Sequence, residues 1–275
     1  MATDGERDDG VQVDLQLHRA HSARMYDYYL GGTTNFAPDR EAAGQALAVF
    51  PWAALAARIN RAFMHRSIRL LAGRGFGQFL DIGTGIPTSP NLHEIAQGVN
   101  PGARVLYTDN DPIVLAHAQA LLHSDPAGRT AYLEGDVLDP KAVLESDELH
   151  DILDLARPVV LSLVALLHFV PDDREARSVV EQLKAALAPG SALVISHGTP
   201  EFAPAEAERV ARIYGANGTP VRMRTREEIA RFFDGWEFLP PGLVATRRWR
   251  PEPTDPGPGA TDAEASAYAG VAVKP

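Results

Sequence analysis

The first third of the chain carries apolar residues at helical spacing and has no good strand pattern. In the segment WAALAARINRAFMHRSIRLLA (residues 52–72), apolar side chains recur about every four positions, which predicts an amphipathic helix. An earlier, aromatic-rich helix is expected to end at Gly31 and Gly32, because glycine readily adopts the left-handed backbone of a helix C-terminus. A further helix is expected to begin near Asp39. We therefore expect a helical N-terminal cap over residues 16–76.

The pattern changes at residue 78, where short apolar runs begin to alternate with helical stretches. Strand, helix and strand at this spacing predict right-handed βαβ crossovers, and hence a mostly parallel sheet with helices on both faces. The expected strands are QFLDI (78–82), ARVLYTD (103–109), TAYLEGD (130–136), PVVLSLVALLHF (158–169) and SALVISH (191–197), with helices beginning near Pro90, Pro112, Pro140 and Asp172. The fold class is therefore α/β and Rossmann-like.

The C-terminal part of the chain has a different pattern. WEFLPPGLVATRRW predicts two short strands around a Pro-Pro turn, which would add an antiparallel edge to the sheet. Thr225 and Glu228 form a capping box for a short helix. Residues 251–275 are rich in proline, glycine, alanine and acid, so we expect an extended tail lying on the surface. The predicted domain organisation is a mobile leader (1–15), the helical cap or lid (16–76), a ligand-binding domain (77–250) and the tail (251–275).

Charge and composition narrow the classes of partner. Acids outnumber bases 36 to 26 and the net charge is −10, which disfavours nucleic acid because its phosphates need a basic surface. Two local basic runs, ARINRAFMHRSIR and VRMRTR, carry apolar residues at helical or strand spacing. A solvated face explains each of them about as well as a nucleic-acid-binding patch does. No apolar run is long enough for a membrane span and no secretory signal is visible, so we expect a cytoplasmic protein without a membrane partner. The chain has no cysteine and its histidines are scattered, so no metal site is expected.

The stretch QFLDIGTGIPTSPN carries the first candidate chemistry. Gly83 and Gly85 allow a tight turn at the end of a strand, but no Gly-Lys-Ser/Thr follows to make a P-loop. Thr88 replaces the third glycine of a dinucleotide fingerprint, and the acid Asp81 is unfavourable beside a pyrophosphate. A ligand with an ammonium and a sulfonium, S-adenosylmethionine (SAM), therefore fits the loop better than NAD. The alternative is a strand-to-helix turn that needs its glycines only for steric reasons and binds no ligand.

Acids also end the next two strands. Asp109 lies at about the distance past the glycines at which an acid accepts hydrogen bonds from ribose hydroxyls. Asp111 is assigned instead to capping the helix that begins at Pro112. Asp136 is expected to accept from an adenine amino group, with the Val137 N–H donating to a ring nitrogen. The predicted cofactor-binding residues are Asp81, Gly83, Gly85, Asp109, Asn110, Asp136 and Val137.

These residues together resemble the motifs of class I SAM-dependent methyltransferases over roughly residues 78–200. A narrower resemblance covers nearly the whole chain: ARMYDYYLGGTTNFAPDREAA, FLDIGTGIPT, VLYTDNDPIVLAHA, LLHFVPDD and YAGVAVKP are similar to an actinobacterial family of SAM-dependent methyltransferases whose substrates are unassigned. The resemblance implies that residues 77–250 are a methyltransferase domain with SAM as cofactor. The expected function is transfer of a methyl group to a small-molecule acceptor by in-line displacement.

Catalytic groups are harder to select, because a base is needed only if the acceptor must lose a proton. His168, at the end of the fourth strand, is the first candidate base, and Tyr28 is the second catalytic candidate. His197 has a weaker claim. The alternative for His168 is an imidazole that only packs at a strand end.

The segment RMYDYYLGGTTNF is a candidate lid over cofactor and acceptor. Arg24, Tyr26 and Asn35 are its candidate lid or substrate residues, and the alternative is a helix packed on the sheet with half-buried tyrosines. Two other functions stay open at this point. An NAD(P)-dependent oxidoreductase is disfavoured by the glycine loop, and a non-catalytic SAM-binding sensor is favoured by the lack of an obvious pair of base and orienting group.

Overall fold

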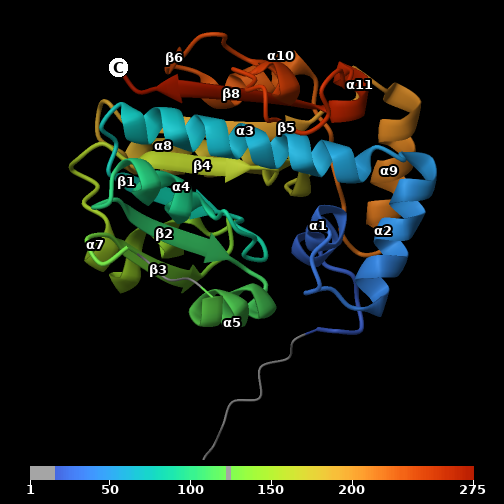
Figure 1. Ribbon diagram of the computed structural model, residues 1–275, viewed down its shortest axis with the longest axis horizontal. Coiled ribbons are helices and arrows are strands. Elements are labelled where there is room, and N and C mark those ends of the chain that lie inside the picture. The colour runs from blue at the N-terminus through green and yellow to red at the C-terminus, as the bar shows by residue number, and fades with distance from the viewer. Residues whose placement is uncertain (1–15, 122–124) are drawn as a thin grey trace, which may run out of the picture.

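An open sheet forms the centre of the molecule, and the computed structural model describes residues 16–121 and 125–275 (Figure 1). Within these residues the strands run in the order β3-β2-β1-β4-β5-β8-β6, and β7 also pairs with β8. The strands are β1 (Gln78–Ile82), β2 (Arg104–Asp109), β3 (Arg129–Glu134), β4 (Val160–Val164), β5 (Ala192–Gly198), β6 (Glu237–Phe238), β7 (Val244–Ala245) and β8 (Ala267–Val273). β1 to β5 are parallel, whereas β8 runs antiparallel to β5, β6 and β7. The expected leader, residues 1–15, lies outside the described residues.

The parallel strands carry their polar residues to one edge of the sheet. Asp81 of β1 lies opposite Tyr107 of β2 and Ser162 of β4, and Asp109 of β2 lies opposite Glu134 of β3. The strand order reverses between β1 and β4, so the loops that follow these two strands diverge to opposite sides. The crevice at the carboxyl ends of β1 and β4 is therefore where a ligand is expected to bind.

Helices cover both faces of the sheet, as the sequence pattern predicts. They are α1 (Ser22–Leu30), α2 (Ala37–Val49), α3 (Ala53–Gly73), α4 (Leu92–Val99), α5 (Pro112–Leu121), α6 (Pro140–Glu145), α7 (Asp147–Ile152), α8 (Asp173–Ala186), α9 (Pro204–Ala216), α10 (Arg226–Ala230) and α11 (Asp262–Ala265). In β1, the neighbours Phe79 and Leu80 enter different core clusters because successive strand side chains point to opposite faces. Phe79 packs with Phe63 of α3, and Leu80 with Val180 of α8. The Rossmann-like α/β fold is confirmed.

The N-terminal helices divide into two roles. α3 lies along the sheet, whereas α1 and α2 lie beyond the carboxyl ends of the parallel strands, beside α9 (Figure 1). α1 ends at Gly31, which has a φ of +83° as expected for a left-handed helix cap. The segment predicted as one cap thus contributes one helix to the layer that packs on the sheet and two helices to the edge where the ligand crevice lies.

The C-terminal segment corrects one expectation. Instead of an extended tail on the surface, residues 267–273 form β8, which lies between β5 and β6 with its middle residues buried. A side chain on Gly270 would lie 3.1–3.3 Å from Phe238, Leu243 and Phe233. The glycine in the middle of β8 therefore fits a position that neighbouring side chains approach closely.

Over residues 16–121 and 125–275, no single helix has the length and apolar composition to cross a membrane, and only α2 and α3 taken together do, across a bend of 101°.

Candidate functional site

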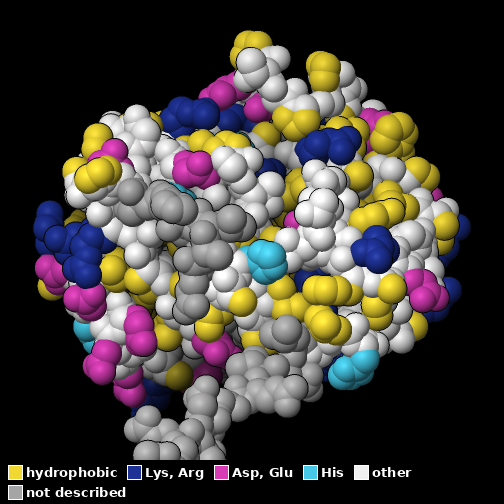
Figure 2. Space-filling model, turned by 60° about the horizontal axis from the view of Figure 1, so that its bottom comes forward, with side chains coloured by type: hydrophobic (Ala, Val, Ile, Leu, Met, Phe, Trp, Pro, Cys, Tyr) yellow, Lys and Arg dark blue, Asp and Glu magenta, His cyan; other side chains and the backbone are white. Residues whose placement is uncertain are grey.

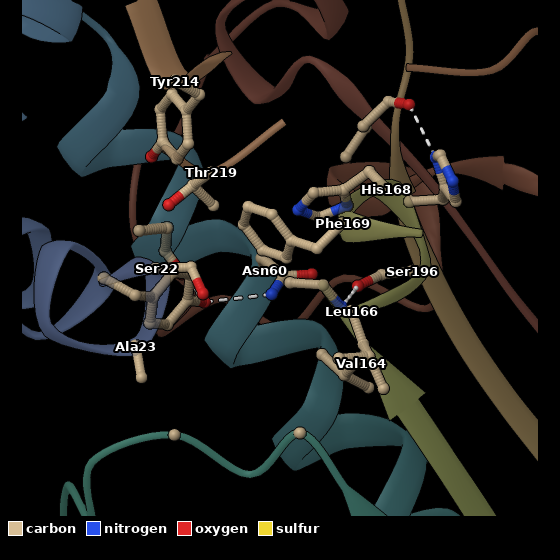
Figure 3. A pocket seen from close by; sticks show the side chains of 18 of the residues that line it. Ser22, Ala23, Asn60, Val164, Leu166, His168, Phe169, Ser196, Tyr214 and Thr219 are labelled. Carbon is tan, nitrogen blue, oxygen red and sulfur yellow. Dashed lines mark hydrogen bonds between the residues drawn. The ribbon is translucent and has the colours of Figure 1, made fainter. Parts of the chain in front are cut away.

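A pocket of about 440 Å³ opens at the carboxyl ends of the parallel strands (Figure 3). The loop after β1 and the ends of β2 to β5 form one part of its wall, and α1, α3 and α9 form the other. All the residues predicted from the sequence to bind cofactor line this pocket: Asp81, Gly83, Gly85, Asp109, Asn110, Asp136 and Val137.

The glycine loop needs its glycines for two physical reasons. Gly83 and Gly85 have φ values of +71° and +69°, in the left-handed region that residues with a Cβ rarely adopt. A Cβ on Gly83 would also lie 2.5 Å from a methyl carbon of Leu166, which follows β4. The Gly83 N–H donates to the carbonyl of Thr108 at 2.7 Å. The loop is therefore held against the ends of both neighbouring strands.

Asp109 is the best-anchored acid of the pocket. One carboxylate oxygen accepts from the Gly85 N–H at 2.8 Å and the other from the Asp111 N–H at 3.0 Å, and the residue is only 6% exposed. Burial raises its pKa to about 6, although these backbone hydrogen bonds oppose the shift. Asp109 thus pins the glycine loop while its carboxylate borders the pocket.

Asp136 and Asn110 connect the loops after β2 and β3. The Asn110 side-chain amide donates to Asp136 at 3.0 Å, and the other carboxylate oxygen of Asp136 accepts from the Leu138 N–H at 2.9 Å. This pairing orients both side chains at the pocket wall, next to the buried Val137.

Asp81 is a buried acid at the end of β1. Burial raises its pKa, and the neighbouring hydroxyls of Ser162 and Thr84 and the charge of Arg61 oppose this shift. A carboxyl held in such a place is stabilised in its ionised form by a cationic ligand. The arrangement fits the expectation that the loop receives a positively charged group.

His197 is committed to the protein on both ring nitrogens. Its Nε2 lies 3.0 Å from a guanidinium nitrogen of Arg224 and its Nδ1 lies 2.7 Å from the carbonyl of Gly198. Because guanidinium is always a donor, Nε2 accepts and Nδ1 carries the proton that it donates to Gly198. His197 is therefore a neutral structural histidine with no nitrogen left for a substrate.

His168 is differently placed. The expected fourth strand ends early, at Val164, and His168 lies in a short 3₁₀ turn, Leu167–Phe169, on the pocket wall. Its Nδ1 has no hydrogen-bond partner among the described residues, and burial together with the charge of Arg224 lowers its pKa to about 4. The imidazole is therefore neutral at physiological pH.

Arg224 organises this region and was missed by the sequence analysis. It is only 2% exposed and donates to the carbonyls of Leu167 and Val170, both at 2.8 Å, and to Asp173 at 3.0 Å. It belongs to the basic run VRMRTR, for which a binding patch and a solvated face are equally good interpretations from sequence. The alternation of basic and apolar residues in this run was the one sequence signal that could indicate a buried arginine. The carbonyls that accept its hydrogen bonds lie more than 50 residues away in the chain, so the sequence does not identify them. Arg224 brackets the turn that carries His168.

We expect His168 and His197 to remain neutral from about pH 5.5 to 8, because burial holds both pKa values below the usual 6.5. Two-dimensional NMR of the imidazole carbons and nitrogens would show constant chemical shifts for both rings over this range. The His168→Gln variant assigns its resonance, and a sample in urea, where histidines titrate near 6.5, is the control. A midpoint near 6.5 for His168 in the folded protein would contradict the expectation.

The lid candidates separate into pocket and anchor residues. Tyr26 lines the pocket, donating to the carbonyl of Ala57 at 3.0 Å and accepting from the Asn60 amide at 2.9 Å. Tyr29 also lines it, whereas the predicted catalytic residue Tyr28 does not. Positions three apart share a helix face, so α1 turns Tyr28 away from the pocket. Helical periodicity was the signal that could have selected Tyr29 over Tyr28.

The other two lid candidates hold the cap in place and do not line the pocket. The Arg24 guanidinium lies 3.2 Å from the Asp111 carboxylate, which also caps α5 by accepting from the Ile113 N–H at 3.0 Å. Asn35 donates its side-chain amide to Asp27 at 2.8 Å. Arg24 and Asp111 therefore tie α1 to the loop after β2.

Comparisons with known proteins agree with this geometry. A family model described as S-adenosyl methyltransferase matches residues 8–275. The crystal structure of a DUF574 family protein from Streptomyces avermitilis is 48% identical, covers 95% of this chain and 100% of its own, and has a TM-score of 0.93. A protein from Thermobifida fusca, described as a proposed methyltransferase, is 40% identical, covering 94% of this chain and 97% of its own, with a TM-score of 0.86.

More distant comparisons add only the fold. An O-methyltransferase family protein from Burkholderia thailandensis is 18% identical, covers 81% of this chain and 59% of its own, and has a TM-score of 0.53. A comparison with curated proteins found no match.

Proposed function

Because the chain belongs to the S-adenosyl methyltransferase family and is a SAM-dependent methyltransferase, we propose that it methylates a small molecule bound in the pocket beside SAM. Membership of this family favours SAM-dependent methyl transfer over the two alternatives, an NAD(P)-dependent oxidoreductase and a non-catalytic SAM-binding sensor. When bound, SAM supplies an electrophilic methyl group on a sulfonium. The observation that carries the proposal is a single pocket that joins the strand-end acids to a separate group of aromatic side chains around His168.

The strand-end residues have the chemistry to hold SAM. In the proposal, Asp81 offsets the positive charge of the amino acid part, and Asp109 accepts hydrogen bonds from the ribose hydroxyls. Asp136 and the Val137 N–H bind the adenine edge. Gly83 brings the backbone close to the ligand. The buried carboxyls of Asp81 and Asp109 support this assignment, because each has a raised pKa that an adjacent cation or hydrogen-bond donor would restore toward its usual value.

His168 is proposed as the group that takes a proton from the acceptor. It lies on the pocket wall, is neutral, and has an uncommitted Nδ1. An imidazole in this state accepts a proton as the acceptor becomes acidic during methylation. Arg224 supports the role by fixing the turn that carries it.

The surface supports a small acceptor in place of a polyanion. On the face shown in Figure 2, Lys and Arg side chains are scattered among acidic and apolar ones and form no basic stripe. The net charge of −10 adds general repulsion toward nucleic acid. A pocket of about 440 Å³ is in the size range of small-molecule sites.

Isothermal titration with S-adenosylhomocysteine (SAH), the demethylated product, tests the cofactor site. We expect one molecule to bind per chain with a dissociation constant in the micromolar range, roughly 1 µM to 1 mM as for typical enzyme ligands. NADH, titrated under the same conditions, is the matched control and should release no heat of binding. Binding of NADH without binding of SAH would rule the proposal out.

A further inference from the structure

The pocket continues past the strand-end acids into a second region. We call the side chains of Tyr29, His168, Phe169, Tyr214 and Thr219 the aromatic end of the pocket. In Figure 3 the labelled members of this group lie at the opposite end of the view from the loop that follows β1. They come from α1, α9, the loop after α9 and the turn after β4, whereas the proposed SAM residues lie at the carboxyl ends of β1 and β2 or in the loops that follow β1, β2 and β3. The aromatic end is thus available to a second ligand.

The rings at this end form one continuous wall. The centroids of Phe169 and Tyr214 are 6.1 Å apart with planes tilted by 32°, and the His168 ring lies 4.4 Å from that of Phe169. The planes of His168 and Phe169 are tilted by 53°, so the three rings share no single face, and a planar ligand would pack against the edge or face of individual rings. Aromatic rings recognise other rings in this way by offset or tilted stacking.

The polar groups of the wall are all uncharged. Burial raises the pKa of Tyr29 to about 12 and raises that of Tyr214 well above its usual value, and it lowers the pKa of His168 to about 4. A charged ligand would lose hydration here without meeting an opposite charge, which is costly. Glu206, an acid of α9 that also lines the pocket, has a partly exposed side chain already paired with Arg209 at 3.0 Å.

The geometry points to an uncharged aromatic compound bearing a hydroxyl group as the methyl acceptor, stacked on Phe169 and Tyr214 with its hydroxyl near His168. This inference rests on the methyl transfer proposed above. The acceptor oxygen forms the new C–O bond as the C–S bond of SAM breaks, sulfur keeps the electron pair to give SAH, and the hydroxyl proton passes to His168. The pocket volume of about 440 Å³ is shared with SAM, so one or two fused rings are the size that fits.

A hydroxyl fits the wall better than a nucleophile that is charged at neutral pH. An aliphatic amine is protonated at neutral pH and would enter as a cation, and a carboxylate would enter as an anion. Both meet the desolvation cost described above. A hydroxyl enters neutral, hydrogen-bonds to tyrosine or threonine hydroxyls, and has a proton that the neutral His168 imidazole accepts in the inferred reaction.

Binding of three matched probes to the full chain saturated with SAH tests the inference. The probes are 2-naphthol, which is neutral at pH 7, 2-naphthoate, which is an anion, and 2-naphthylmethylammonium, which is a cation. By isothermal titration we expect a submillimolar dissociation constant for 2-naphthol and at least about tenfold weaker binding of both charged probes.

Two variants locate the binding. Phe169→Leu keeps an apolar side chain but loses the ring, and we expect 2-naphthol to bind about three- to tenfold more weakly, as loss of an aromatic contact predicts. Phe238→Leu, an exposed position on β6 outside the pocket, is the matched control and should bind 2-naphthol as the wild type does. The affinity for SAH reports that both variants are folded.

The outcomes separate the inference from the proposed function. If SAH binds but a charged probe binds as tightly as 2-naphthol, or Phe169→Leu leaves 2-naphthol binding unchanged, the acceptor class is wrong while the methyltransferase assignment stands. Failure of all three probes to bind the SAH complex overturns the acceptor class in the same way. If SAH itself fails to bind, the proposed cofactor site falls and the inference falls with it.

Discussion

Deletion of residues 267–275 is expected to abolish folding. These residues contain β8, which pairs along its full length with β5 and joins β6 and β7 to the sheet. Its removal leaves the backbone groups of β5 unpaired on one side and exposes the core around the fully buried Ala269, Val271 and Ala272. Each unpaired buried polar group costs about 1–3 kcal/mol, and a whole protein has only about 5–15 kcal/mol of stability.

Circular dichroism and thermal melting of the truncated protein would measure this effect. Deletion of Pro275 alone, an exposed residue beyond β8, is the matched control and should shift the melting temperature by no more than about 2 °C. A truncated protein that melts cooperatively near the wild-type temperature would show that β8 is not part of the essential core.

Asp109→Ala is expected to weaken SAH binding by about 30- to 1000-fold. Two hydrogen bonds to a charged acceptor, each contributing about 1.5–3 kcal/mol before relaxation, would be lost to the ligand. The glycine loop would also lose the anchor that Asp109 provides through the Gly85 N–H. After relaxation of the site, the expected loss of binding free energy is about 2–4 kcal/mol, which corresponds to this range of affinity. Isothermal titration of the variant with SAH measures it directly.

Glu134→Gln is the matched control for this prediction. Glu134 ends the neighbouring strand but is exposed, and it does not line the pocket, so the Glu134→Gln variant should bind SAH with the affinity of the wild type.

Asp109 has a pKa raised to about 6, so it is ionised above this pH and protonated below it. Wild-type affinity for SAH should therefore fall between about pH 7 and 5, and Asp109→Asn should reduce this dependence. An unchanged affinity in Asp109→Ala would remove the ribose assignment.

Strand positions and helix starts were predictable because they depend on nearby residues. The segment QFLDI coincides with β1, and the expected capping box of Thr225 and Glu228 is present, with hydrogen bonds at 3.2 and 2.8 Å. The helix predicted to begin at Pro112 does begin there, capped by Asp111. Periodicity and capping act over a few residues, so a single sequence carries them in full.

Distant contacts decided the features that the sequence analysis missed. The hydroxyls of Tyr29 and Tyr214 meet across 185 residues, and the guanidinium of Arg66 donates to the carbonyl of Trp249 across 183. Arg66 belongs to the other basic run, for which a solvated face is one of the two interpretations from sequence, yet it is buried like Arg224. A charged residue in a strand or helix pattern does not show in sequence whether a distant carbonyl will cover it.

By itself the sequence determined the alternation of strands and helices, the glycine loop, and the acids that end β1, β2 and β3. These follow from local backbone geometry and from the rule that parallel strands bring their carboxyl ends to one edge. Only the tertiary structure decided that Tyr26 and Tyr29 face the pocket while Tyr28 does not, that His197 is locked while His168 is free, and that the C-terminal segment is a buried strand. Each of these depends on which distant surface a side chain packs against, and that choice is made by the whole fold.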